Sequence, residues 1–144
     1  MKIVLGSDHA GFARKEEIKA YLESQGLMVI DVGCFSAERV DYPDFGYAAA
    51  KKVASKEADY GIVVCFTGIG IGMAANKVKG VRCATVASLD QVDLTRRHND
   101  ANMLAFGAKY VDKDLAFKLI DKFLETPFDG GRHQARVDKL DKGC

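Results

Sequence analysis

A cysteine and a glycine-rich turn stand together in the segment CFTGIGIG, residues 65–72. Cys65 ends a β-branched run, and Gly68, Gly70 and Gly72 lead into an Ala-rich segment. Glycines let a backbone approach a ligand closely, and the unpaired N–H groups at a helix start favour an anion. A thiolate beside such a helix start is stabilised and can act as a base or a nucleophile. The segment therefore predicts a phosphate or oxyanion site next to a reactive thiol.

Two simpler interpretations of this segment stay open. The glycines can serve a tight strand-to-helix turn without any ligand, and a lone cysteine in an apolar strand is often a small core residue. Known nucleotide-binding motifs do not fit, because GxGxxG requires glycine where Met73 stands, and no Gly-Lys-Ser/Thr follows. Cys83 lies in the middle of an apolar run, so we expect it in the core.

Histidine and arginine supply the other candidates for chemistry. His98 lies in the polar cluster RRHNDAN, and histidine suits proton transfer near neutral pH. Arg132 and Arg136 are four residues apart, so a helix places both on one face. Their charges repel each other unless a dianion such as phosphate binds both guanidinium groups. A surface or capping role for His98 and a merely solvated basic face are the alternatives.

Apolar strands alternate with amphipathic helices along the whole chain. Strands are predicted at 2–7, 27–33, 60–65, 81–87 and 102–107, and helices at 12–26, 43–56, 72–79, 89–98, 114–125 and 132–142. This alternation implies right-handed crossovers and a parallel sheet with helices on both faces. We therefore expect an α/β fold with five parallel strands in a single domain, residues 1–144, ending in a C-terminal helical extension.

Ligands of a parallel sheet collect at the edge where the carboxyl ends of the strands lie. The segments SDHAG (7–11) and CFTGIGIG follow two of the strands and are polar or glycine-rich. We expect the histidine and arginine motifs to gather around this same edge. His9, in the first segment, has a second interpretation as a helix-start residue with Ser7 or Asp8 as the cap.

Composition and charge exclude several classes of protein. The 144 residues are 48% hydrophobic, which fits one domain with a sizeable core. Twenty-one basic and twenty acidic residues leave a net charge of +1, so no nucleic-acid or membrane partner is expected. The four cysteines form no CxxC pair, and no apolar run reaches about 18 residues. We expect a cytoplasmic protein with reduced thiols and no zinc site.

Six motifs, spread in order over nearly the whole chain, match a known family. They are GSDHAG (6–11), DYPD (41–44), CFTGIGIGMAANK (65–77), RHNDAN (97–102), LAFGAK (104–109) and GGRHQARV (130–137). Together they resemble the type B ribose-5-phosphate isomerases, whose superfamily includes allose-6-phosphate and galactose-6-phosphate isomerases. The resemblance implies a Rossmann-like three-layer α/β/α sandwich and an aldose-ketose isomerase that needs no metal or cofactor. It also implies a homodimer or a dimer of dimers whose active sites are shared between subunits.

The resemblance implies a role for each matching residue. Cys65 resembles the base that moves a proton between carbons 1 and 2 of the sugar, with Thr67 hydrogen-bonding nearby. His98 resembles the acid/base that opens the furanose ring, supported by Asp8. The remaining matches are substrate-binding positions: the backbone of Phe66, Thr67, Gly68, Ile69 and Gly70 as the anion hole for the enediolate, His9, Arg132 and Arg136 on the phosphate side, Asn99 at a sugar hydroxyl, and Lys109.

Two positions depart from the family pattern and leave the substrate open. Phe66 replaces a glycine and adds a bulky wall near the sugar, and Lys109 replaces a frequent arginine and lacks its bidentate fork. The activity expected is the interconversion of ribose 5-phosphate and ribulose 5-phosphate through an enediolate. The alternatives are an isomerase of a six-carbon sugar phosphate, such as allose or galactose 6-phosphate, and a non-catalytic phosphate- or nucleotide-binding module. One chain carries both the cysteine turn and the His-Arg motifs, which favours a homo-oligomer.

Overall fold

Five parallel strands form the central sheet in the order β2-β1-β3-β5-β4. The computed structural model describes residues 1–144. The strands are β1 (Lys2–Ser7), β2 (Met28–Asp31), β3 (Tyr60–Cys65), β4 (Cys83–Thr85) and β5 (Met103–Gly107). Every neighbouring pair is parallel, which confirms the predicted topology.

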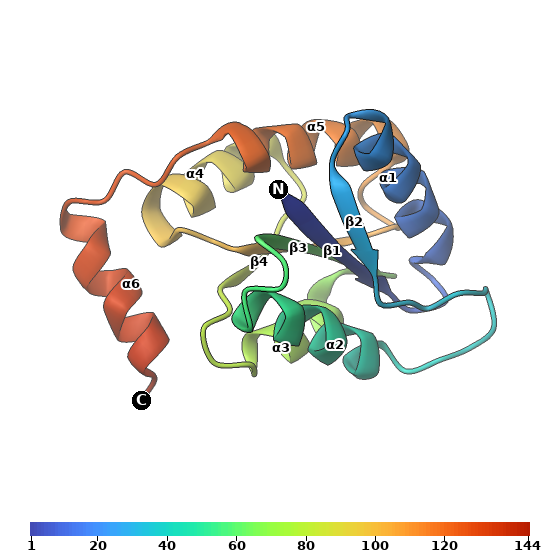
Figure 1. The fold of residues 1–144 in the computed structure, drawn as a ribbon, viewed down its shortest axis with the longest axis horizontal. Coiled ribbons are helices and arrows are strands. Elements are labelled where there is room, and N and C mark those ends of the chain that lie inside the picture. The colour runs from blue at the N-terminus through green and yellow to red at the C-terminus, as the bar shows by residue number, and fades with distance from the viewer.

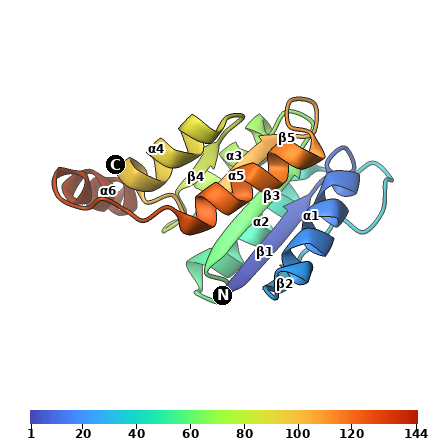
Figure 2. The same cartoon turned by 90° about the horizontal axis from the view of Figure 1, so that it is seen from above.

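Six helices complete the fold. They are α1 (Phe12–Ser24), α2 (Tyr42–Ala54), α3 (Ile69–Asn76), α4 (Leu89–Asn99), α5 (Lys113–Glu125) and α6 (Arg132–Lys142). Helices α1, α4 and α5 cover one face of the sheet and α2 and α3 the other, so the α/β/α sandwich is confirmed (Figures 1 and 2). Helix α6 stands apart as the predicted C-terminal extension, beside α4 (Figure 1). None of the six is both long and apolar enough to cross a membrane.

The strands send alternate side chains into two cores, one on each face of the sheet. Ile3 and Leu5 of β1 pack with α1, α4 and α5, whereas Val4 packs with α2 and α3. Because both faces are covered, the strands read as nearly continuous apolar runs. Cys65, the last residue of β3, belongs to the core between the sheet and the α2–α3 layer.

Two elements differ most from the prediction: β4 spans only Cys83–Thr85 instead of 81–87, and α3 starts and ends three residues early. The helix begins at Ile69, three residues before the predicted start, so Gly70 and Gly72 lie inside it. Glycine disfavours a helix interior, but here packing decides. A side chain at position 70 would collide with the ring of Tyr42, and one at position 72 with Thr85. These two glycines therefore let α3 pack closely against α2 and β4, as the simpler interpretation of the segment holds.

Candidate active site

Cys65 accepts a backbone hydrogen bond at the carboxyl end of β3. The thiol is only 5% exposed, and the N–H of Gly68 donates to its Sγ at 3.1 Å. Gly68 has a φ of 80°, and a side chain there would collide with the backbone of Phe106, so this turn requires glycine. An N–H donor favours a thiolate over a thiol. Cys65 is therefore a core residue, as the simpler interpretation holds, and its sulfur also has a donor that stabilises an anion.

Unpaired backbone donors lie in the turn that follows Cys65. The N–H groups of Thr67, Gly70 and Ile71 make no hydrogen bond within the chain. The side chain of Thr67 is held nearby, because its Oγ1 accepts the N–H of Ile69 at 3.3 Å. The first turn of a helix also carries a partial positive charge. This turn can therefore hold a negatively charged oxygen beside the sulfur of Cys65.

Asp8 and His9 follow β1 at the same edge. The N–H of Asp8 donates to the carbonyl of Val64 at 3.3 Å, so Asp8, directly after β1, lies beside the end of β3. One oxygen of Asp8 accepts the N–H of Gly11 at 3.0 Å and holds the turn into α1. The Nδ1 atom of His9 lies 3.2 Å from both the N and the O of Val40. His9 thereby ties the loop that follows β2 to this edge.

Phe66 and Lys109 contact each other next to Cys65. The N–H of Lys109 donates to the carbonyl of Phe66 at 3.0 Å. The Nζ of Lys109 lies 5.4 Å from the centre of the Phe66 ring and 5.7 Å from that of Tyr110. Cation–π contacts at these distances are attractive. Phe66 is 54% exposed, so the two positions that depart from the family pattern form one unit at the surface, and Phe66 is the chain neighbour of Cys65.

We call the group at this edge the thiol cluster, defined by Asp8, His9, Cys65, Thr67 and Lys109 with the unpaired N–H groups of the turn.

His98 and Asn99 lie at the opposite end of the sheet. Helix α4 starts after the carboxyl end of β4 and runs back, so it ends just before the amino end of β5. Met103 at that end of β5 pairs with Gly61, whereas Gly107 at the other end pairs with Cys65. Four strand residues span about 13 Å.

The expectation that the histidine and arginine motifs share the edge of Cys65 is therefore wrong for a single chain. The segment around His98 follows β4 in sequence, but eleven residues of α4 carry it back across the sheet. For the same reason, Asp8 does not support His98 within one chain.

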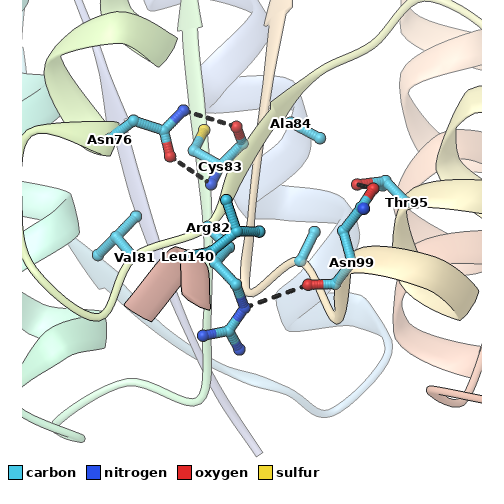
Figure 3. Close-up of a pocket in the computed structure, with 9 residues that line it drawn as sticks. Asn76, Val81, Arg82, Cys83, Ala84, Thr95, Asn99 and Leu140 are labelled. Atoms are coloured by element: carbon cyan, nitrogen blue, oxygen red, sulfur yellow. Dashed lines mark hydrogen bonds between the residues drawn. The ribbon is translucent and has the colours of Figure 1, made fainter. Parts of the chain in front are cut away.

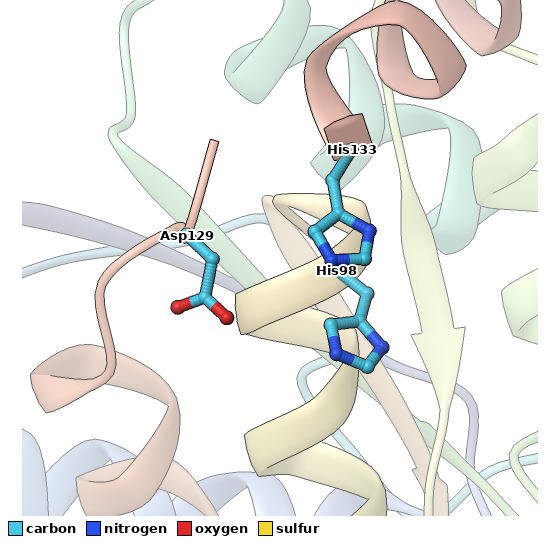
Figure 4. A group of neighbouring side chains, drawn as sticks. All are labelled: His98, Asp129 and His133. Carbon is cyan, nitrogen blue, oxygen red and sulfur yellow. The ribbon is translucent and has the colours of Figure 1, made fainter. Parts of the chain in front are cut away.

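Two histidine rings stack where α4 meets α6. The centroids of His98 and His133 are 4.3 Å apart and their planes differ by 13° (Figure 4). Asp129 places a carboxylate within 4.8 Å of a nitrogen on each ring. Arg97 fixes that carboxylate, because its Nη1 lies 3.3 Å from Oδ1 of Asp129 and its carbonyl accepts the Asp129 N–H at 3.1 Å. The rings therefore form an ordered pair with an anchored acid beside them.

Burial and neighbouring cations keep His133 neutral. Only 9% of the residue is exposed. Desolvation lowers the pKa of His133 first of all, and the charges of His98, Arg132 and Arg136 lower it further. Asp129 opposes this shift. Around neutral pH, the His133 ring is therefore an uncharged surface on which the His98 ring lies.

Arg132 and Arg136 sit one turn apart on α6, as predicted. Both are exposed, and neither forms an ion pair within the chain. Two adjacent guanidinium groups without an acidic neighbour are well placed to bind a phosphate. We call the second group the histidine cluster, defined by His98, Asn99, Arg132, His133 and Arg136.

The donors of His98, Asp129 and His133 are of types that bind zinc, but their arrangement differs from a zinc site. An imidazole lone pair lies in the plane of its ring, and these two planes are stacked nearly parallel. The two lone pairs therefore do not converge on one point, as tetrahedral zinc requires. The geometry favours a stacked pair of rings.

An open cavity of about 430 Å³ lies beside the edge strand β4 (Figure 3). Asn99 lines it, with its carbonyl accepting from Nε of Arg82 at 3.2 Å and its Oδ1 accepting from Thr95 at 3.1 Å. The Asn76 side chain pairs with both backbone groups of Cys83 at 2.8 Å. Burial raises the pKa of Cys83 to about 12, so this thiol stays protonated. Cys83 is half-buried at the margin of the core, and the cavity contains no residue of the thiol cluster.

Comparison with known proteins shows the family to which the chain belongs. Residues 3–140 match the family model described as Ribose/Galactose Isomerase. The chain belongs to this isomerase family. Ribose-5-phosphate isomerase B of Escherichia coli K12 is 45% identical over 139 residues, which cover 96% of this chain and 93% of that protein.

Solved structures of this isomerase family share the fold of the whole chain. The Clostridium thermocellum ribose-5-phosphate isomerase B has a TM-score of 0.97 at 48% identity, with 99% of this chain and 96% of that chain covered. A Mycoplasma genitalium ribose-5-phosphate isomerase B with bound ribulose-5-phosphate has a TM-score of 0.93 at 40% identity, with 98% and 94% covered.

Two residues of this isomerase-family chain were missed by reasoning from the sequence. Asp129 and His133 both lie against His98, but no sequence pattern pairs the start of α6 with the end of α4. One signal was available for His133. It stands four residues before Val137, and these two are the buried residues of α6. Helical periodicity therefore places His133 on the inner face of the helix.

Proposed function

We propose that the chain is an aldose-ketose isomerase that interconverts ribose 5-phosphate and ribulose 5-phosphate. This reaction needs a base that removes a proton next to a carbonyl and donors that stabilise the oxygen that becomes negative. The observation that carries the proposal is the turn after β3. There the Gly68 N–H reaches the sulfur of Cys65 at 3.1 Å, and the N–H groups of Gly70 and Ile71 are unpaired. The relatives named ribose-5-phosphate isomerase B support the pentose substrate.

The thiol cluster carries the proton transfer. The thiolate of Cys65 takes the proton from carbon 2 of the open-chain aldose, and the electron pair moves to the carbonyl oxygen on carbon 1. The unpaired N–H groups hold the resulting enediolate, and each well-placed donor contributes about 3 kcal/mol. Return of the proton from Cys65 to carbon 1, together with transfer of the proton on oxygen 2 to the negative oxygen 1, gives the ketose and restores the thiolate. Thr67 and Asp8 bind hydroxyl groups beside the reacting carbons.

A second copy of the chain completes the site in this proposal. The histidine cluster lies about 13 Å along the sheet from the thiol cluster of the same chain, too far for one sugar to contact both closely. A two-fold axis brings the thiol cluster of each copy to the histidine cluster of the other, so that two sites form. Helix α6 supports this arrangement, because it packs mainly on α4 and leaves Leu140 60% exposed.

The histidine cluster opens the sugar ring and holds the phosphate. Ring opening breaks the bond between carbon 1 and the ring oxygen, takes a proton from the hydroxyl on carbon 1 and gives one to the ring oxygen. His98 transfers these protons. Arg132 and Arg136 bind the phosphate, Asn99 a sugar hydroxyl, and binding energy from the phosphate holds the open chain in place.

Solvent isotope exchange tests the proposed function. Incubation of the protein with ribose 5-phosphate in D2O should place deuterium at carbon 2, and Cys65→Ala should abolish the exchange. Unlabelled sugar after incubation with the wild-type protein would contradict the proposal. That result, together with tight nucleotide binding, is what a non-catalytic phosphate-binding module would give.

A six-carbon sugar phosphate is the second candidate substrate, because Phe66 and Lys109, two positions that depart from the family pattern, lie together at the thiol cluster. An exposed aromatic ring at the residue after Cys65 changes the room for the sugar chain, and a lysine binds a phosphate less directionally than an arginine. Comparing kcat/KM for ribose 5-phosphate and allose 6-phosphate decides between the two substrates.

A further inference from the structure

We infer that His133 is a positioning residue that holds the His98 imidazole in the orientation needed to open the furanose ring. The inference rests on the proposed function, since it concerns the ring-opening step that precedes proton transfer.

The ring of His98 has no other restraint within the chain. Its side chain makes no hydrogen bond, although it lies on the last turn of α4 between polar neighbours. The outer torsion of a histidine side chain is broad, so a ring without partners samples many orientations. The stacking contact with His133, at 4.3 Å between centroids and 13° between planes, is what limits it.

His133 is itself held firmly enough to act as a support. It is buried in the first turn of α6, and its N–H donates to the carbonyl of Gly130 at 3.0 Å. Val137, one turn later, is buried on the same face and anchors the helix. Figure 4 shows the His133 ring reaching from α6 onto the ring of His98, with Asp129 to one side.

The charged groups around the ring pair act on His133 from three segments. Arg132 and Arg136 on α6 disfavour a positive charge on His133, and Asp129, anchored by Arg97 of α4, partly offsets them. A neutral His133 adds no fixed charge beside the imidazole of His98. It offers the flat face of an aromatic ring, and the same helix carries the two arginines proposed to hold the phosphate.

The chemistry of the two substrates separates this role from proton transfer. Ribulose 5-phosphate cannot form a five-membered ring, because a 2-ketose would close through oxygen 5, which carries the phosphate. Exchange of its carbon-1 proton with solvent therefore needs the thiol cluster but no ring opening. Conversion of ribose 5-phosphate, which is mostly cyclic, needs both.

The test compares these two reactions in three variants. For His133→Ala, we expect kcat for ribose 5-phosphate to fall roughly tenfold to a hundredfold, a part of what an acid/base group contributes. Exchange at carbon 1 of ribulose 5-phosphate should change by less than about twofold. His133→Phe keeps a flat ring without the nitrogens and should restore most of the lost turnover. Lys139→Ala, at an exposed position of the same helix, should leave the ratio of the two rates unchanged.

Three outcomes would overturn the inference. One is wild-type turnover of ribose 5-phosphate by His133→Ala, and another is an equal loss in both reactions, which indicates a general structural defect. The third is a His133→Phe variant as slow as His133→Ala although both melt at the wild-type temperature, because the nitrogen and not the stack would then matter. If the wild-type protein itself exchanges neither sugar, the proposed function fails, and that result is distinct from all three.

Discussion

The thiol cluster and the histidine cluster are built in different ways. The first stands on strand ends in the core of the sandwich, and backbone N–H groups supply much of its chemistry. The second lies at the end of α4 and the start of α6, and it consists mainly of side chains: exposed arginines and a stacked pair of histidine rings. The residues proposed for proton transfer are therefore positioned by the sheet of a single chain. The residues proposed for ring opening are positioned by the packing of α6, at the periphery of the fold, against α4.

We expect the largest effect from removing Cys65, the proposed catalytic base of the thiol cluster. Cys65→Ala should lower kcat for ribose 5-phosphate by at least about a thousandfold, since it removes the group that takes the proton. The melting temperature should change little. Cys83→Ala is the matched control, because burial raises the pKa of that thiol to about 12 and it takes no part in the chemistry. Substantial turnover by Cys65→Ala would refute the assignment of the base.

We expect the second-largest effect from a substitution in the turn after Cys65, where the Gly68 N–H donates to the sulfur. Gly68→Ala meets both a φ of 80° and the backbone of Phe106, so we expect a loss above about 3 kcal/mol in the free energy of unfolding together with lost turnover. Gly80→Ala is the control, with a φ of 88° but no atom within 4 Å of the added carbon. It should lose only about 1 kcal/mol in chemical denaturation. Equal losses in the two variants would show that close packing at Gly68 is unimportant.

A change in the histidine cluster should act on binding more than on chemistry. Arg132→Ala removes charge-assisted hydrogen bonds to phosphate and should raise KM for ribose 5-phosphate roughly tenfold to a hundredfold, with kcat less affected. Lys139→Ala on the same helix is the control, because it removes a positive charge without removing the arginine pair. An unchanged KM for Arg132→Ala in steady-state assays would leave α6 without a role at the phosphate.

The smallest effect concerns the choice of substrate at the thiol cluster. Phe66→Gly removes the exposed ring next to Cys65 in the chain and frees the ammonium of Lys109 from one of its two aromatic contacts. We expect the ratio of kcat/KM for allose 6-phosphate over ribose 5-phosphate to rise roughly tenfold. Tyr110→Leu, which removes the other contact, should alter this ratio less. A ratio that stays constant in Phe66→Gly would mean that the ring does not limit the length of the sugar.

Local patterns in the sequence predicted most of the fold, and they predicted that Asp8, Cys65 and the glycine turn lie at one edge of the sheet. Helix α6 begins and ends where the spacing predicts, and β3 ends at Cys65 as expected. The start of α3 was predicted too late, because tertiary packing against Tyr42 overrides the low helix propensity of Gly70. Such a contact joins residues far apart in sequence, so no local pattern contains it.

The position of the histidine cluster illustrates a second limit. His98 follows β4 in sequence, which suggested the edge that holds Cys65. The direction of α4 decides its place instead, and a helix of eleven residues spans roughly 16 Å. The stack with His133 depends on where α6 docks, which a single-chain pattern does not specify. The motifs along the chain therefore named candidate site residues, but they did not predict which of these residues meet within one chain.

Mixing two inactive variants tests the shared site most directly. In a dimer of one Cys65→Ala chain and one His98→Ala chain, one site carries both changes and the other carries neither. After unfolding and refolding equal amounts together, we predict about a quarter of wild-type turnover of ribose 5-phosphate, since half of the dimers are mixed and each has one intact site. A mixture as inactive as its two components would contradict the account, because each site would then belong to a single chain.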